Sequence, residues 1–193
     1  MTARRPRQER PQLVGVPRLE TARLILRAPA PADFEPFAVY CASDRSRFTG
    51  GPLDRNLAWR AFCNVTGNWV QRGYSFFVLE DRATGRAIGM AGPWYPEGWP
   101  EPEIGWQIWD PADEGRGYAG EAAEAARGYV YGVLGWPTAI SLIVAGNARS
   151  EALARRLGCV EDGTFAHAQL GSCAIWRHPA PGALADGGME ACA

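Results

Sequence analysis

The chain has 193 residues and is nearly neutral, with 20 basic residues, all of them arginine, against 21 acidic ones. This balance provides no basic face for a nucleic-acid partner, and no apolar run approaches the roughly 18 residues of a membrane span. Apolar residues make up 47% of the sequence, enough for the core of one α/β domain, and the N-terminus lacks the hydrophobic segment of a signal peptide. We therefore expect a cytoplasmic protein with neither a nucleic-acid nor a membrane partner.

The cysteines and histidines point away from a metal site. The two histidines, His167 and His178, are not paired at ligand spacing, and no two cysteines form a C-x-x-C pair. An odd number of widely spaced cysteines also argues against a disulfide framework. We expect no metal and five reduced thiols: Cys41, Cys63, Cys159, Cys173 and Cys192.

The first part of the chain predicts an arm, a strand and two helices. Residues 1–17 are rich in arginine and proline, which predicts a flexible N-terminal arm. Leu19 to Arg27 alternates apolar and polar side chains, the period of a half-buried strand. After two prolines, apolar residues recur at helical spacing over 32–42 and again from Leu57 to Arg72.

The second part predicts a sheet with further helices. Three strands form an antiparallel meander over 74–80, 86–93 and 103–109, and a glycine-rich turn then leads into an alanine-rich helix that runs to residue 134. A strand at 138–144, a helix at 150–157 and a hairpin over 159–178 follow, and 179–193 is predicted to be a flexible tail. The order predicts one α/β (α+β) domain over 18–178, with about seven mostly antiparallel strands and about four helices.

The glycine-rich turn is the strongest candidate for a ligand site. Gly115, Gly117 and Gly120 leave the backbone free to adopt positive φ and to approach a ligand closely. The first amides of the following helix have no partner inside the helix, so they suit phosphate oxygens. The simpler alternative is that these glycines only form a tight connection between the strand and the helix. The spacing also matches a dinucleotide-binding fingerprint, but the parallel βαβ unit and the acidic residue about twenty positions on are missing, which disfavours a nicotinamide-dependent enzyme.

Two ordered motifs give a resemblance to a known family. Glu114-x-x-Gly117-x-Ala119 resembles the phosphate loop of the GNAT superfamily of acyl-CoA-dependent N-acyltransferases, although Glu114 stands where that family has Gln or Arg. The segment Asn147-x-x-Ser150 followed by Leu157-Gly158-Cys159 is similar to the ribosomal-protein N-acetyltransferase (RimJ/RimL-like) branch, with Cys159 in place of Phe. The stretch Glu103-Ile-Gly-Trp and the residues Gly-Tyr-Ala-x-Glu-Ala after the loop resemble the same branch.

The resemblance implies a site for acetyl-CoA. It implies a sheet that splays between its fourth and fifth strands, so that the backbone of Gln107, Ile108 and Trp109 binds the pantetheine arm and a fixed N–H faces the thioester oxygen. The amides of residues 115–120 would hold the diphosphate, with the side chains of Arg116 and Tyr118 beside it. Asn147 would bind the pantetheine amides or serve as an ordinary helix cap.

The resemblance also implies a direct attack of an amine on the thioester. Glu103 is the candidate base, against the alternatives of a solvated charge at a strand end or a water chain as the base. Ser150 takes the position of the acid that protonates the leaving thiolate. Because Glu114 and Cys159 depart from the family motifs, a second interpretation stays open: a non-catalytic acyl-CoA-binding module.

The acceptor is predicted only as a class. The loop 94–102 is rich in tryptophan, tyrosine and glutamate, which suits a cationic amine by aromatic and acidic contact. The acceptor would be a small molecule or a protein N-terminus. The same loop would also serve as a packing surface or as the interface of a homodimer.

Overall fold

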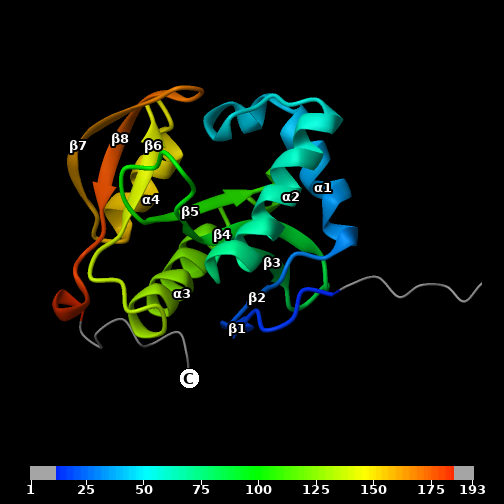
Figure 1. Cartoon of the computed structure of the whole chain (residues 1–193), viewed down its shortest axis with the longest axis horizontal. Coiled ribbons are helices and arrows are strands. Elements are labelled where there is room, and N and C mark those ends of the chain that lie inside the picture. The colour runs from blue at the N-terminus through cyan, green and yellow to red at the C-terminus, as the bar shows by residue number, and fades with distance from the viewer. Residues whose placement is uncertain (1–11, 185–193) are drawn as a thin grey trace, which may run out of the picture.

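The computed structural model describes residues 12–184, and a single mixed sheet runs through them (Figure 1). Its spatial order is β1-β2-β3-β4-β5-β6-β8-β7. The strands are β1 (Leu19–Glu20), β2 (Leu24–Arg27), β3 (Phe77–Asp81), β4 (Ala87–Trp94), β5 (Glu103–Ile108), β6 (Ile140–Val144), β7 (Val160–His167) and β8 (Gly171–Arg177). The α-helices are α1 (Phe34–Ala42), α2 (Arg55–Arg72), α3 (Tyr118–Gly132) and α4 (Ala148–Arg156). The predicted fold class, a mostly antiparallel mixed sheet flanked by helices, is confirmed.

The two central strands pair only where they begin. Every other pair of neighbouring strands is antiparallel, whereas β5 and β6 are parallel and share a single pair of residues in register, Glu103 and Ile140. The Ile140 amide donates to the Pro102 carbonyl at 3.0 Å, and beyond this point the strands separate. The predicted splay therefore lies between β5 and β6.

The segment predicted as one strand from Leu19 to Arg27 is instead a short hairpin. Thr21 closes the turn, since its amide donates to the Leu24 carbonyl at 3.0 Å and its hydroxyl oxygen accepts from the Leu24 amide at 2.9 Å. Glu121 of α3 holds the same turn, because it accepts hydrogen bonds from the Thr21 hydroxyl and from the Arg23 amide. Within the described part of the chain, the sheet consequently has eight strands rather than about seven.

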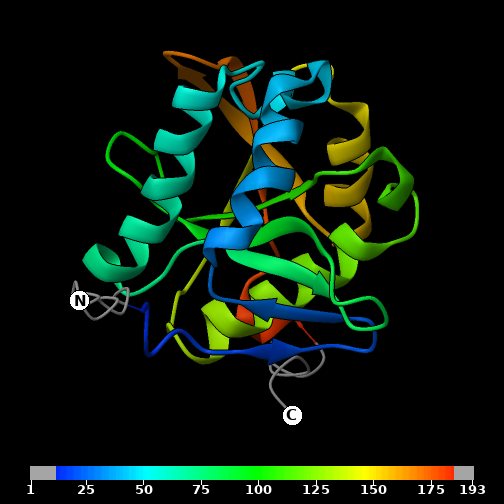
Figure 2. The same ribbon diagram turned by 90° about the vertical axis from the view of Figure 1, so that its right-hand side faces the viewer.

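Two helical layers cover the central strands on opposite faces (Figures 1 and 2). α1 and α2 pack on the face that carries Val78 and Met90. α3 packs on the other face, where its small residues Ala122 and Ala126 are fully buried and let the helix lie close to β4 and β5. α4 covers β6 and β8 in a separate cluster. The helix predicted from Leu57 to Arg72 begins at Arg55, since the Asp54 side chain caps it.

Parts of both predicted flexible ends contact the domain. Leu13 and Val16 pack against the core, although they belong to the predicted arm 1–17. At the other end Leu184 also packs there, and the Pro179 carbonyl accepts a hydrogen bond from the Tyr131 hydroxyl at 2.9 Å. The remaining residues of the two predicted ends, 1–11 and 185–193, lie outside the described part.

Candidate active site

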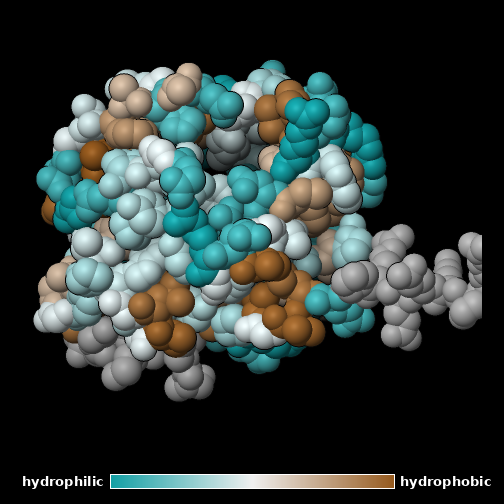
Figure 3. Space-filling model, in the orientation of Figure 1, coloured by the Kyte–Doolittle hydropathy of each residue, from teal (hydrophilic) through white to brown (hydrophobic). Residues whose placement is uncertain are grey.

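The gap between β5 and β6 is closed at one end and open at the other. Near its closed end the Ser141 hydroxyl donates to the Ile104 carbonyl at 2.6 Å. Further along, the Trp106 indole reaches Ser150 at the start of α4, at 3.3 Å. The open end leads to the glycine turn. The face in view is hollowed above β5, between the half that contains β6 and β8 and the half that contains α2 (Figure 3).

The backbone of β5 faces the gap at every second residue. The Trp109 amide donates to the Ile88 carbonyl at 2.9 Å, toward β4, and a Cβ built on Gly89 would lie 2.2 Å from the Gln107 carbonyl oxygen. Alternate residues of an antiparallel strand bond to the same neighbour, so Gln107 and Trp109 face β4, while Ile108 and Trp106 face the gap. Of the three consecutive residues predicted to bind pantetheine, Gln107 directs its backbone to β4 and Ile108 directs its backbone to the gap, while the Trp109 amide faces β4 and its carbonyl accepts from Arg45.

The predicted glycine turn is present, with two of its three glycines in the left-handed region. Gly115 and Gly117 have φ of 71° and 82°. Gly120 lies inside α3 and does not have positive φ, so that part of the prediction is wrong; a Cβ there would lie 3.4 Å from Leu153. Gly117 caps α3, and a Cβ on Gly115 would meet no atom within 4 Å, which leaves room above the turn for a ligand. Ala119, the last residue of the phosphate-loop motif, is in the first turn of α3.

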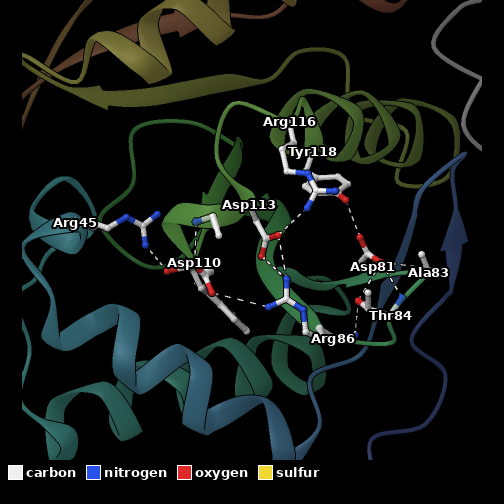
Figure 4. A network of polar contacts seen from close by, with 11 residues as sticks. Arg45, Asp81, Ala83, Thr84, Arg86, Asp110, Asp113, Arg116 and Tyr118 are labelled. Atoms are coloured by element: carbon white, nitrogen blue, oxygen red, sulfur yellow. Dashed lines mark hydrogen bonds and ion pairs between the residues drawn. The ribbon is translucent and has the colours of Figure 1, made fainter.

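Two buried carboxylates, Asp113 and Asp81, bind side chains of the glycine turn (Figure 4). Asp113 accepts two hydrogen bonds from Arg86, at 3.0 and 2.9 Å, and one from Arg116 at 3.3 Å. Asp81 accepts a hydrogen bond from the Tyr118 hydroxyl at 2.7 Å, and this lowers the pKa of Asp81. The amides at the start of α3 are therefore fixed before any ligand arrives.

These contacts connect the side chains of Arg116 and Tyr118 to the two buried carboxylates. The Tyr118 ring is buried and points to Asp81, away from the turn, so only its backbone amide is free to face a phosphate (Figure 4). The Arg116 guanidinium lies 4.9 Å from the centre of that ring and binds Asp113. The Tyr118 hydroxyl is therefore directed away from the turn, whereas the Arg116 side chain is 54% exposed and its placement beside the phosphates stays a prediction.

Glu103 is buried at the closed end of the gap. Its carboxylate accepts hydrogen bonds from the Trp99 indole and, at 3.2 Å, from the Leu142 amide on β6. Burial raises the pKa of Glu103 to about 7, against the lowering effect of these two donors. The alternative of a solvated charge at a strand end is thus excluded. A carboxyl that titrates near neutral pH is suited to accept and release a proton.

Ser150 and Asn147 lie together at the start of α4. The Asn147 side chain accepts from the Ser150 amide at 3.3 Å and caps the helix, as one of the two predicted roles requires. The Ser150 hydroxyl accepts from Trp106, which leaves its own hydrogen for another acceptor. Ser150 and Glu103 are on opposite faces of β5, because Trp106 and Glu103 belong to opposite faces of the pleat.

The loop before β5 forms an aromatic group beside Glu103. Trp94 stacks on Phe76 at 4.9 Å, and Trp99 meets the His167 ring edge-on at 4.9 Å. The acidic residues of the loop are already paired, Glu97 with Arg72 and Glu101 with Arg177. The loop therefore offers an acceptor aromatic surfaces rather than unpaired negative charge.

Two arginines that sequence reasoning missed meet at Glu114. Arg45 comes from the 3₁₀ helix η2 (Asp44–Thr49) and Arg149 from α4, and both bind the Glu114 carboxylate. Arg45 also donates to the carbonyl oxygens of Ile108, at 2.9 Å, and Trp109. These residues lie 69 and 35 positions from Glu114, so no local pattern indicates the contact.

No helix in residues 12–184 is long and apolar enough to cross a membrane. Among the same residues no group of three histidine, cysteine or acidic side chains is arranged to hold a metal ion. The described cysteines, Cys41, Cys63, Cys159 and Cys173, are free thiols, and Cys192 lies outside the described part.

A mixed sheet thus splays beside a glycine turn, and comparisons with known proteins identify the family that has this fold. The family model described as an acetyltransferase (GNAT) domain matches residues 23–160. The chain belongs to this family. An acetyltransferase from Agrobacterium tumefaciens is 34% identical, with a TM-score of 0.79 over 89% of this chain and 99% of that one.

Two further solved structures are similar in fold. A putative GNAT-family acetyltransferase from Bordetella pertussis is 27% identical, with a TM-score of 0.70 over 84% of this chain and 99% of that one. A putative ribosomal-protein-serine acetyltransferase from Vibrio cholerae is 20% identical, with a TM-score of 0.67 over 84% of this chain and 97% of that one. At that identity the second likeness shows the fold alone.

Proposed function

We propose that this chain is an N-acetyltransferase that moves an acetyl group from acetyl-CoA to a primary amine by direct attack. The observation that carries the proposal is the gap between β5 and β6, which has a buried carboxyl with a raised pKa at its closed end and the glycine turn at its open end. Membership of the GNAT acetyltransferase family supports the acetyl donor.

The residues of the turn and of β5 fit the donor. The backbone amides of Tyr118, Ala119 and Gly120 open the helix α3 and suit the diphosphate, since helix N-termini attract anions. The Ile108 amide and the backbone of Trp106 would bind the pantetheine arm, with Asn147 at the facing helix end. Acetyl-CoA supplies the activated acetyl thioester, and no covalent intermediate with the enzyme is needed.

The side chains around the gap account for the proton transfers. Glu103, ionised at neutral pH in part of the molecules, takes the proton from the incoming ammonium, so that the amine nitrogen can attack. A backbone N–H that faces the gap stabilises the negative charge that develops on the thioester oxygen. The Ser150 hydroxyl would protonate the departing thiolate, since its hydrogen is not used by Trp106.

The acceptor is a primary amine of a small molecule or of a protein N-terminus. The motifs Asn147-x-x-Ser150 and Leu157-Gly158-Cys159 favour a protein N-terminus, because they resemble those of the RimJ/RimL-like branch. The aromatic group of Phe76, Trp94 and Trp99 would contact the acceptor beside Glu103.

Turnover tests the proposal directly. The purified chain is mixed with acetyl-CoA and a panel of amines, which contains N-terminal peptides, polyamines and aminoglycosides, and the release of CoA thiol is followed. We expect release that requires an amine, and a Glu103→Gln variant that binds acetyl-CoA normally but turns over slowly. Acetyl-CoA binding without release for any amine would instead support the alternative, a non-catalytic acyl-CoA-binding module.

A further inference from the structure

Glu114 places a carboxylate at the start of the glycine turn, where an approaching phosphate would be repelled. Its two oxygens are bound by Arg45 and Arg149, which reach it from opposite sides. Because two guanidinium groups surround one carboxylate, the group as a whole is positively charged. Glu114, although it is itself negatively charged, therefore holds two positively charged side chains next to the turn.

Arg149 has hydrogen-bond donors to spare. Its side chain is 81% exposed, and one of its terminal nitrogens donates to Glu114. A guanidinium carries five N–H donors in a planar fork that matches the oxygens of a phosphate. Arg149 can thus bind a phosphate at the turn without losing a contact that the fold depends on.

Arg45 reaches the same place from the other half of the molecule. Only 24% of its side chain is exposed, and it donates to the backbone carbonyls of Ile108 and Trp109 at the end of β5 as well as to Glu114. Its Nε is buried and has no hydrogen-bond acceptor among residues 12–184. The carbonyl contacts fix the guanidinium at the open end of the gap whatever happens to Glu114.

We propose that Arg45 and Arg149 bind the diphosphate of acyl-CoA, and that Glu114 is the counter-ion that holds both guanidinium groups in place until the diphosphate replaces it. The inference rests on the proposed function, because it assumes that the glycine turn receives acyl-CoA. It adds two arginines, from η2 and α4, to the backbone amides of the turn. Each arginine contributes a full positive charge and a planar set of donors that can bind two phosphate oxygens at once.

Calorimetric titration of the full chain with CoA and with dephospho-CoA tests the proposal. Both ligands contain the diphosphate, and only CoA has the 3′-phosphate. We expect Arg149→Ala to weaken both ligands equally, by about tenfold or more. We expect Glu114→Gln to strengthen both severalfold, since it removes the competing carboxylate. Arg156→Ala is the matched control, because it removes one positive charge from the other end of α4, and it should change neither affinity by more than about twofold.

Each contrary result has a distinct meaning. Unchanged affinity in Arg149→Ala would overturn the phosphate-binding role, and a loss confined to CoA would move that role to the 3′-phosphate. Weaker or unchanged binding in Glu114→Gln would overturn the counter-ion role. Thermal melting shows whether each variant is folded. If the unmodified chain bound neither ligand, the proposed function would fail together with this inference, whereas normal binding by the unmodified chain and all variants would refute the inference alone.

Discussion

Replacement of Glu103 by glutamine should change how the stability of the protein depends on pH. In the unfolded chain this carboxyl titrates near its ordinary pKa of 4.5, whereas burial in the fold raises the pKa to about 7. Between these two values the folded state binds more protons than the unfolded state, so the free energy of unfolding falls as the pH rises. At about 1.4 kcal/mol per unit of pKa, the loss is about 3 kcal/mol in total.

Glutamine cannot ionise, so the variant should not show this loss. It has only one acceptor oxygen for the two donors, Trp99 and Leu142, and this costs about 1–2 kcal/mol at every pH. The variant should therefore be the less stable protein in acid and become relatively more stable as the pH rises. The slope of the difference, rather than its absolute value, tests the reasoning.

Urea unfolding of the two proteins, from below pH 4.5 to above pH 7, measures the difference. Contributions from all other groups cancel, because both proteins contain them. Glu124→Gln is the control, since Glu124 is exposed on α3, and its difference from the unmodified protein should stay nearly flat. Parallel curves for the unmodified protein and Glu103→Gln would show that the carboxyl is not buried in solution, and would remove the reason for choosing it as the base.

Three further predictions concern His178 and the glycine turn. Burial lowers the pKa of His178 to about 3, against 6.5 for the free side chain. The stability that depends on its neutral form is therefore complete above pH 6.5 and is lost as the pH falls toward 3. Urea unfolding of a His178→Gln variant should not show this loss. Gly117→Ala should cost about 1–2 kcal/mol through its positive φ and also weaken acetyl-CoA binding, whereas Gly98→Ala, at φ of 84° in a loop, should cost stability alone; calorimetry and melting separate the two. Asp113→Asn should weaken the bond to Arg86 and speed hydrogen exchange of the turn amides, and unchanged exchange would show that the turn does not depend on this contact.

Local periodicity predicted most of the elements. The meander of β3, β4 and β5 and the helices α1 to α4 follow from alternation, helical spacing and cap residues such as Asp54. The splay between β5 and β6 came from the resemblance of two motifs, not from periodicity. The break after Glu20 was missed, because Glu121, a hundred residues away, stabilises that turn by accepting from Thr21.

The site was predicted less completely, because its chemistry depends on contacts between distant segments. Glu103 was chosen from its strand position, but its burial depends on Trp99 and Leu142, which no spacing indicates. The backbone of Gln107 bonds to β4 and is not available to pantetheine. Alternation along β5 predicts this only once it is known which residues of the strand bond to β4. The partners of Glu114 come from η2 and α4, and only the folded structure brings them together.

Calorimetric titration with acetyl-CoA and NAD in parallel tests most directly whether the glycine turn and the splayed strands form an acyl-CoA site. We predict that acetyl-CoA binds with a dissociation constant in the micromolar range or tighter, about −8 kcal/mol, and that NAD does not compete with it. Absence of acetyl-CoA binding, or tighter binding of NAD, would contradict the proposed function while leaving the fold unchanged.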